Sequence, residues 1–376
     1  MQRRLFLQTS VASAIWAHYV PKRKYRAVII GDTGQEDYGH GWDLAWQGIP
    51  AVQVVAVAGP DGERRRKAMK ITGAPRGYRD YHEMLAKEKP DLATICPTRL
   101  GERLPMVTAA AENGAHILIE KPFARDLREA DAIVAITEKH GVTVQVGHTA
   151  RIIPVTMAVK SLLDKGELGV LLEMRGRGKE DGRAGGTDLM VLGTHVFDLM
   201  RYFAGDPSWV FAHVSEQGSE LRPNMRKQDD SAGLVGGDRV EAVFAFPHGV
   251  HGHFSSKLND GWRRRFGVTL YGSRGFVVLP LTKVPSIAPY MLRGRSWIPE
   301  RGDERWERVD YPPGEVMSTR EDVNRAMAMD LLAAIENKRS PVCSARDSRW
   351  TIEMVAGIYQ SQWSGGRVAL PLSART

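Results

Sequence analysis

Lys121 occupies a position at which a side-chain amine can do proton chemistry. It follows the run His116–Ile119 and Glu120, and it directly precedes Pro122. A short apolar, β-branched run predicts a buried strand, and a residue at the carboxyl end of a parallel strand faces the crevice in which doubly wound sheets bind ligands. Pro122 disfavours a helical backbone at Lys121. A lysine held there can accept the proton of a substrate hydroxyl, as general acid–base catalysis requires.

His195 and two aspartates in one predicted helix form a second group of chemically capable residues. An imidazole can stabilise an oxygen on which charge develops, and a histidine buried for packing is the alternative. Asp188 precedes His195 by seven residues, and seven steps of ~100° return to within ~20° of the same helix face. Asp188 therefore either lies beside His195 at the substrate or caps the helix. Asp198, three residues after His195, is predicted to contact the substrate or to support His195.

Glycines after the first predicted strand indicate a turn that binds phosphate. Glycine lets the backbone approach a pyrophosphate, and the following helix offers free N–H groups to it. Thr33 and Glu36 stand where a strict G-x-G-x-x-G pattern has glycines, so a purely structural turn is the alternative. The residues of this turn that we expect to contact a cofactor are Gly31, Thr33, Gly34, Tyr38 and Gly39.

The end of the second predicted strand bears on the choice of dinucleotide. Gly59 stands where an acidic residue commonly binds the adenosine ribose. Arg64, Arg65 and Arg66 follow shortly after. A guanidinium there can bind a 2′-phosphate, although the run can equally be the solvated start of a helix. Both NAD and NADP therefore stay open as cofactors.

The first part of the chain alternates short β-branched runs with longer amphipathic stretches, which is typical of a parallel sheet flanked by helices. The clearest helix runs from Asp126 to His140: Asp126 can cap it and Gly141 ends it. Five strands are predicted, at Ala27–Ile30, Val54–Ala58, Leu92–Cys96, His116–Ile119 and Val142–Val146.

After Pro154 the pattern changes to consecutive strands joined by short turns, which predicts an antiparallel sheet. The predicted strands are Val170–Arg175, Trp209–Val214, Arg239–Phe246, Val250–Ser256, Phe266–Tyr271 and Phe276–Leu279. The predicted helices are Thr156–Lys165, Asp188–Phe203, Glu321–Asn337 and Ala345–Gln362. We therefore expect an α/β Rossmann-like parallel-sheet domain at 25–150 and, at 151–376, a substrate-binding α+β domain with a mainly antiparallel open sheet and C-terminal helices.

Three separate stretches carry a resemblance to a known family. They are Glu120-Lys121-Pro122 after Pro97-Thr98, Gly193-Thr194-His195-Val196-Phe197-Asp198, and the ending Val368-Ala369-Leu370-Pro371-Leu372. Together they resemble the glucose–fructose oxidoreductase / inositol dehydrogenase / MocA family along nearly the whole chain. In that family an aspartate four residues before the histidine commonly joins it at the substrate, but Val191 stands there in this chain.

The resemblance implies an NAD(P)-dependent oxidoreductase that acts on a secondary hydroxyl of a sugar, cyclitol or glycoside. It implies Lys121 as the proton-transfer group, His195 as the group that polarises the substrate oxygen, and Asp188 as a catalytic candidate. Further cofactor contacts are expected from Pro97, Thr98, Glu120 and Pro122, and substrate contacts from His148, Arg151, Asp198 and Trp262. His148 and Arg151 can equally hold the domain interface.

Two other functions stay open on the sequence. One is a glycosidase or lyase that oxidises its sugar only transiently with tightly bound NAD. The other is a non-catalytic protein that keeps the dinucleotide for stability. The intact Lys121 and His195 argue against the latter.

Composition and charge exclude several classes of partner. The net charge is +8, but the basic residues are spread among 44 acidic ones and no nucleic-acid motif accompanies them. Two cysteines exclude a disulfide scaffold. His248, His251 and His253 lack acidic or cysteine partners at ligand spacing, so no metal site is predicted. A homo-oligomer through the C-terminal sheet is an expectation that the resemblance adds.

Residues 1–24 resemble a twin-arginine export signal or, alternatively, an apolar arm. Arg3 and Arg4 precede a stretch, Leu5 to Val20, without a formally charged residue. We expect export of the folded protein to the periplasm, with a cytoplasmic location as the alternative, and no stable insertion in a membrane, because no later stretch has the ~20 apolar residues of a span.

Overall fold

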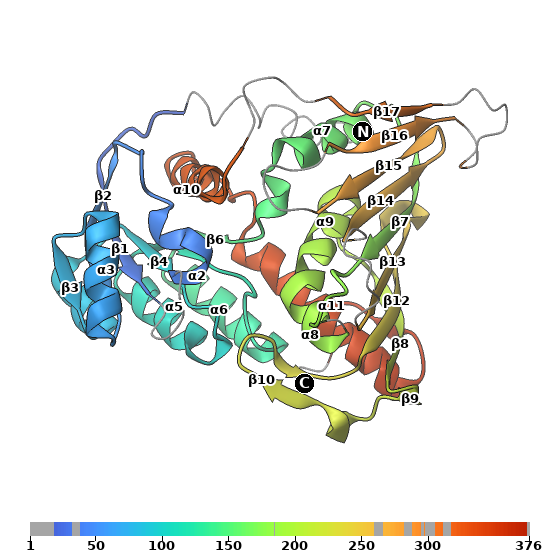
Figure 1. Ribbon diagram of the computed structural model, residues 1–376, viewed down its shortest axis with the longest axis horizontal. Helices are drawn as coiled ribbons and strands as arrows, with labels where there is room; N and C mark the ends of the chain where they lie inside the picture. The colour runs from blue at the N-terminus through green and yellow to red at the C-terminus, as the bar shows by residue number, and fades with distance from the viewer. Residues whose placement is uncertain are drawn as a thin grey trace.

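The structure is a computed structural model that describes residues 19–31, 38–183, 185–258, 266–281, 288–294, 297, 305–310 and 317–373. Within these residues two sheets, each covered by helices, lie side by side (Figure 1). The helix α11 (Ala345–Ser364) runs between them and contacts both.

The first sheet is parallel and has the strand order β3-β2-β1-β4-β5-β6. Its strands are β1 (Tyr25–Ile30), β2 (Val52–Ala58), β3 (Arg76–Tyr78), β4 (Leu92–Ile95), β5 (His116–Ile119) and β6 (Val144–Val146). Its helices are α2 (Tyr38–Gly41), α3 (Gly62–Thr72), α4 (Tyr81–Glu88), α5 (Arg103–Glu112) and α6 (Leu127–Lys139). The five predicted strands are confirmed, with shifted ends in four of them. The order reverses between β1 and β4, and this switch point opens the crevice in which such sheets bind ligands.

Local chemistry explains why these segments fold as they do. The strands β1, β4 and β5 are almost entirely buried, as β-branched runs covered on both faces should be. In α6, the Asp126 side chain accepts a hydrogen bond from the Glu129 N–H at 2.8 Å, so the predicted cap is confirmed. Asp61 caps α3 in the same way through the Arg64 N–H.

The second sheet has ten strands among the described residues, and only its β7–β13 pair is parallel. The order is β17-β16-β15-β14-β7-β13-β12-β8-β18, with β9 paired to β8. The strands are β7 (Leu171–Arg177), β8 (Trp209–Glu216), β9 (Ser219–Glu220), β12 (Arg239–Ala245), β13 (His251–Lys257), β14 (Gly267–Gly272), β15 (Gly275–Pro280), β16 (Tyr290–Arg293), β17 (Trp306–Arg308) and β18 (Val368–Ala369). The predicted antiparallel open sheet is confirmed.

Helices cover the face of this sheet that is turned toward the first domain (Figure 1). They are α7 (Pro154–Asp164), α9 (Thr194–Ala204) and α11, while α10 (Arg320–Glu336) returns to pack beside β6 and α2. A separate hairpin of β10 (Lys227–Asp229) and β11 (Gly233–Val235) reaches back to the first domain, where the Leu100 N–H donates to the Asp230 carbonyl at 3.0 Å.

The predicted helix at 188–203 is not a continuous α-helix. A short α8 (Gly186–Asp188) is followed by one π-helical segment, η4 (Leu189–Gly193), before α9 begins at Thr194. A π turn closes i→i+5 hydrogen bonds and rotates less per residue than an α turn. The same-face argument for Asp188 and His195, which assumes ~100° per residue, therefore does not hold across this segment.

Candidate active site

Lys121 lies at the carboxyl end of β5, one strand from the switch point of the parallel sheet. Its side chain is buried, and Nζ donates a hydrogen bond to the carbonyl of Val191 in the π turn at 3.2 Å. Burial lowers the pKa of Lys121, and the charges of Arg103 and Arg183 lower it further, against the opposing effect of Glu120. A buried amine with a lowered pKa is suited to exchange a proton with a substrate hydroxyl.

Glu120 is held by His40 and Trp42, two residues that follow the glycine turn and that were not predicted as site residues from the sequence. Its carboxylate accepts hydrogen bonds from Trp42 Nε1 at 2.6 Å and from His40 Nδ1 at 2.8 Å. Burial opposes its ionisation, but His40, Lys121 and Arg103 outweigh burial and bring its pKa to about 2. Glu120 is therefore an anion that ties β5 to α2 and stands beside the lysine.

Gly147, at the end of β6, leaves room for this carboxylate. A Cβ atom at Gly147 would lie 2.8 Å from Glu120 Oε2 and 2.8 Å from the Trp42 ring, closer than real Cβ contacts. Neither Trp42 nor His40 belongs to a motif, so a sequence signal for them exists only in their position after the glycine turn.

His195 and His148 meet next to Lys121. Their rings are T-shaped, with centroids 5.4 Å apart. Burial and the charge of Lys121 lower the pKa of both imidazoles, that of His148 to about 3 and that of His195 well below its ordinary value. Both rings are therefore neutral at physiological pH. The structure brings three of the predicted site residues into one cluster, in which Lys121 and His148 are buried and His195 is partly buried.

Asp188 does not cap the helix. Its carboxylate is fully buried and makes no cap hydrogen bond. Oδ2 instead accepts from Ser256 Oγ at 2.6 Å and from the Glu180 N–H at 3.4 Å. The capping alternative is therefore wrong, and the geometry favours a carboxylate that holds the segment after β7 against β13. Burial raises the pKa of Asp188 to about 6.

Arg151 and Asp198 bind each other. Arg151 Nε donates to Asp198 Oδ2 at 2.8 Å, Arg151 Nη2 lies 2.7 Å from Asp198 Oδ1, and both side chains are buried. Arg151 also lies 3.3 Å from Asp347 at the start of α11. This arrangement favours the domain-interface alternative for Arg151 over a contact with substrate.

A hollow of about 480 Å³ at the carboxyl ends of β1 and β2 fits the adenosine end of a dinucleotide. Its lining includes Gly31, Gly59, Arg79, Tyr81 and Glu102. Glycines at both strand ends leave the backbone open to a ligand, as the sequence predicted.

The arginines of the run near this hollow differ in their hydrogen bonds. Arg65 donates to the carbonyl of Gly59, so its guanidinium is engaged. Arg64 Nη1 is buried without a hydrogen-bond partner among the residues that the structure describes. Arg64 therefore has donor capacity left for a ligand.

The remaining residues predicted to contact the cofactor lie at the loops of the same crevice. The Pro97 carbonyl accepts from Arg103 Nη2 at 2.8 Å, and Thr98 follows it half-buried. Tyr38 and Gly39 begin α2. The predicted contacts of Thr33, Gly34 and Trp262 lie outside the described residues.

The described part of the chain contains no helix that is both long and apolar enough to span a membrane.

Two family profiles match consecutive parts of the chain. Residues 25–148 match the oxidoreductase family with an NAD-binding Rossmann fold. Residues 156–278 match the GFO/IDH/MocA C-terminal domain.

Curated relatives extend the similarity over most of the chain. D-apiose dehydrogenase of Paraburkholderia graminis is 28% identical over 344 residues, which cover 87% of this chain and 85% of the relative. The NAD(+)-dependent scyllo-inositol 2-dehydrogenase of Bacillus subtilis is 28% identical over 285 residues, which cover 73% of this chain and 80% of the relative.

Solved structures share the fold. A levoglucosan dehydrogenase in complex with NADH and levoglucosan superposes with a TM-score of 0.77 and 20% identity, covering 93% of this chain and 100% of that one. At 20% identity this similarity shows that the two chains share a fold.

Proposed function

This chain belongs to the Gfo/Idh/MocA family of oxidoreductases, and we propose that it oxidises a secondary hydroxyl of a sugar, cyclitol or glycoside with NAD or NADP as hydride acceptor. The observation that carries the proposal is the cluster of the buried side chains of Lys121 and His148 with the partly buried His195 at the crevice of the parallel sheet. The names of the relatives, which include apiose, inositol and levoglucosan dehydrogenases, support a carbohydrate-like substrate.

The residues of the cluster divide the proton chemistry between them. The neutral amine of Lys121 accepts the hydroxyl proton as the carbinol C–H bond breaks. His195 then stabilises the oxygen as charge develops on it. Glu120 stands beside the ammonium that Lys121 becomes, and its charge favours this protonated state.

The residues present fit a nicotinamide dinucleotide. Gly31, Gly59 and Arg64 would hold its adenosine end, and Pro97 and Thr98 would lie along the path toward Lys121. When bound, the cofactor supplies the carbon that accepts the hydride.

A substrate panel tests the proposal. The purified full chain is first analysed by native mass spectrometry to identify a co-purifying dinucleotide, and it is then offered NAD or NADP with D-apiose, scyllo-inositol, levoglucosan and related polyols. Formation of NADH or NADPH with at least one polyol supports the proposal. Release of an aglycone from a glycoside without net reduced cofactor would instead favour a redox-neutral glycosidase or lyase.

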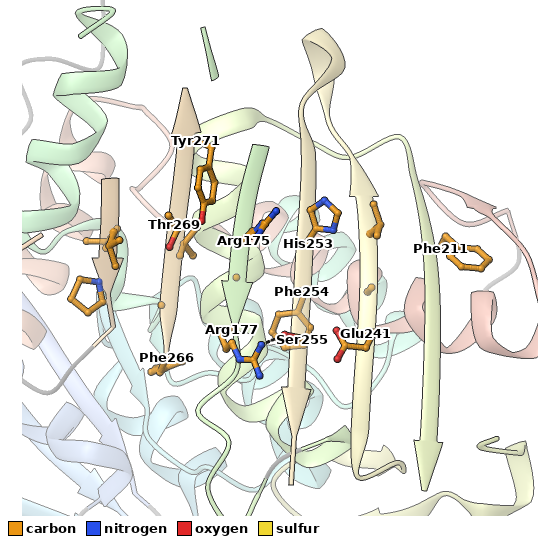
Figure 2. Close-up of a pocket in the computed structure, with 18 of the residues that line it drawn as sticks. Arg175, Arg177, Phe211, Glu241, His253, Phe254, Ser255, Phe266, Thr269 and Tyr271 are labelled. Carbon is orange, nitrogen blue, oxygen red and sulfur yellow. Dashed lines mark hydrogen bonds between the residues drawn. The ribbon is translucent and has the colours of Figure 1, made fainter. Parts of the chain in front are cut away.

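We also propose that the open face of the second sheet binds a second copy of the chain. This face has a hollow of about 560 Å³ across β14, β7, β13 and β12 (Figure 2). Its side chains combine exposed apolar groups, such as Phe211, with both signs of charge, such as Arg177 and Glu241. A patch that carries both signs can complement its own copy across a two-fold axis.

The oligomeric state decides this point. Light scattering after size exclusion should give a dimer or higher oligomer for the wild type and a smaller species for Phe211→Glu. A monomeric wild type would overturn the proposal.

Finally, we propose that Arg3-Arg4 and the uncharged stretch after these residues direct export of the folded protein, and a prediction in the Discussion tests this.

A further inference from the structure

A chain of buried polar groups leads from the candidate active site to the domain interface. His148 Nδ1 lies 3.1 Å from Ser348 Oγ, which lies 3.5 Å from Cys343 Sγ. Cys343 Sγ in turn lies 3.6 Å from Asp198 Oδ1. All four residues are fully buried. Neither Ser348 nor Cys343 has a role in the mechanism above.

The carboxylate at the far end sets the direction of these hydrogen bonds. Asp198 is fixed by the guanidinium of Arg151 and can only accept, so the Cys343 thiol must donate to it. Burial and the charge of Asp198 raise the pKa of Cys343, so the proton needed for this bond is present.

The remaining two bonds follow from this one. With its proton used, Cys343 Sγ has only lone pairs for Ser348, so the Ser348 hydroxyl donates to sulfur. Ser348 Oγ then accepts from His148, which requires a proton on Nδ1. The opposite direction would leave two lone pairs facing each other between Ser348 and Cys343.

A neutral imidazole with its proton on Nδ1 carries a lone pair on Nε2. His148 Nε2 is buried and has no hydrogen-bond partner among the residues that the structure describes. It lies on the ring edge opposite Ser348, in the ring that meets His195. A buried polar atom left unpaired costs ~1–3 kcal/mol, so an unpaired acceptor beside a reaction centre points to a ligand that donates to it.

We propose that His148 Nε2 accepts a hydrogen bond from a substrate hydroxyl adjacent to the one that is oxidised, so that the site selects vicinal diols. This inference rests on the proposed function, because it names the substrate class of the same site. The Ser348–Cys343–Asp198 chain acts as the positioning device that fixes the tautomer of His148.

A metal ion is the competing use of the same atoms. Ligand atoms of His148, Asp198 and Cys343 lie within 4.8 Å of one another. However, Arg151 already places a cation 2.7 Å from Asp198 Oδ1, and a metal would require loss of the Cys343 proton. The electrostatics therefore favour the hydrogen-bond chain, and metal content becomes an outcome of the test.

The tautomer is measured directly by nitrogen NMR on the full chain labelled with ¹⁵N-histidine, with His148 assigned by its absence in His148→Asn. The expected spectrum shows a protonated Nδ1 and an unprotonated Nε2 between about pH 5 and pH 8, the range in which free histidine titrates. A proton on Nε2, or an imidazolium in this range, overturns the proposal. So does stoichiometric zinc in elemental analysis that disappears in Cys343→Ala.

Two substitutions separate the ring nitrogens in kinetics. His148→Gln places an amide oxygen near the position of Nε2, whereas His148→Asn keeps a polar group only near Nδ1. With a polyol oxidised in the panel, kcat/KM should fall about 10- to 100-fold in His148→Asn and less than about 5-fold in His148→Gln, with NADH affinity unchanged in both. Equal losses in the two variants overturn the proposal.

The two readouts distinguish the failures. If no polyol is oxidised, the proposed function fails, while the nitrogen spectrum still decides whether His148 offers an acceptor. If a polyol is oxidised and its deoxy analogue, which lacks the neighbouring hydroxyl, reacts equally well, the vicinal-diol assignment is wrong although the dehydrogenase activity stands.

Discussion

Lys121→Met removes the proton-transfer amine and keeps the length of the side chain. The substitution deletes the hydrogen bond to the Val191 carbonyl, while Glu120 keeps its bonds to His40 and Trp42. The fold and the cofactor crevice should therefore survive. What is lost is a group whose catalytic contribution is typically ~10²–10⁴-fold, or about 2.7 to 5.5 kcal/mol of activation free energy.

Among the described residues, the two imidazoles that lie next to Lys121 are poor replacements for it as a base. Burial is the main cause that lowers the pKa of His148 and of His195, and it persists in Lys121→Met, so both imidazoles stay weak bases for the hydroxyl proton. We therefore expect kcat for alcohol oxidation to fall at least 100-fold. NADH affinity, measured by fluorescence titration, should change less than about 3-fold. Lys87→Met, at an exposed lysine on α4, is the matched control and should keep full turnover.

The pH profile gives this prediction a second signature. Because the neutral amine is the base, oxidation should rise with pH through the pKa of Lys121 and level off below the ordinary lysine value of 10.5. The positive charge of Lys179 contributes to that lowering, so Lys179→Met should move the inflection to higher pH. A Lys121→Met variant with more than about a tenth of wild-type turnover would refute the proton-transfer role.

Three further outcomes are expected. Arg64→Ala should lower the ratio of NADP to NAD affinity, measured by isothermal titration, by at least about 10-fold. Arg66→Ala, on the exposed side of α3, is the control and should leave this ratio unchanged. An unchanged ratio for Arg64→Ala would show that the arginine run is a solvated helix start and binds no 2′-phosphate. Asp188→Asn should keep turnover within a few-fold of the wild-type value, because the Asp188 carboxylate accepts hydrogen bonds from Ser256 and Glu180 and none from Lys121. Burial raises the Asp188 pKa to about 6, so folding favours the neutral form and this contribution to stability is lost as pH rises through the folded-state pKa. Between about pH 4 and pH 7 the wild type should therefore lose about 2 kcal/mol more free energy of unfolding than Asp188→Asn in urea titrations, and equal slopes would remove Asp188 as the titrating group. Replacing Arg3 and Arg4 with Lys should retain the protein in the cytoplasm, and a cytoplasmic wild type would contradict the export proposal.

Much of the fold could be predicted because burial leaves a periodic trace in the sequence. The run His116–Ile119 and the cap at Asp126 were found at their observed positions, since a strand covered on both faces and a capped helix each have a local signature. The strand β3 (Arg76–Tyr78) was missed because its three residues are short and largely exposed. An edge strand of that kind carries no hydrophobic pattern.

Site residues could be predicted where a side chain capable of proton chemistry stands in a local sequence context that identifies its place in the fold. Lys121 and His195 stand in recognisable local contexts, and the structure brings them together. His40 and Trp42 contact Glu120 across about 80 residues of chain, a contact that only the tertiary fold creates. The π turn before His195 was equally hidden, because its five residues are apolar and continue a helical pattern.

Transfer of deuterium tests the central claim most directly. The purified chain is incubated with NAD or NADP and a polyol of the panel that carries deuterium on the carbinol carbons, and the reduced dinucleotide is analysed by mass spectrometry. Hydride transfer from carbon predicts one deuterium atom per molecule of reduced cofactor, made by the wild type and at least 100-fold more slowly by Lys121→Met. A reduced cofactor without deuterium, or no dinucleotide bound or reduced with any polyol, would contradict the account.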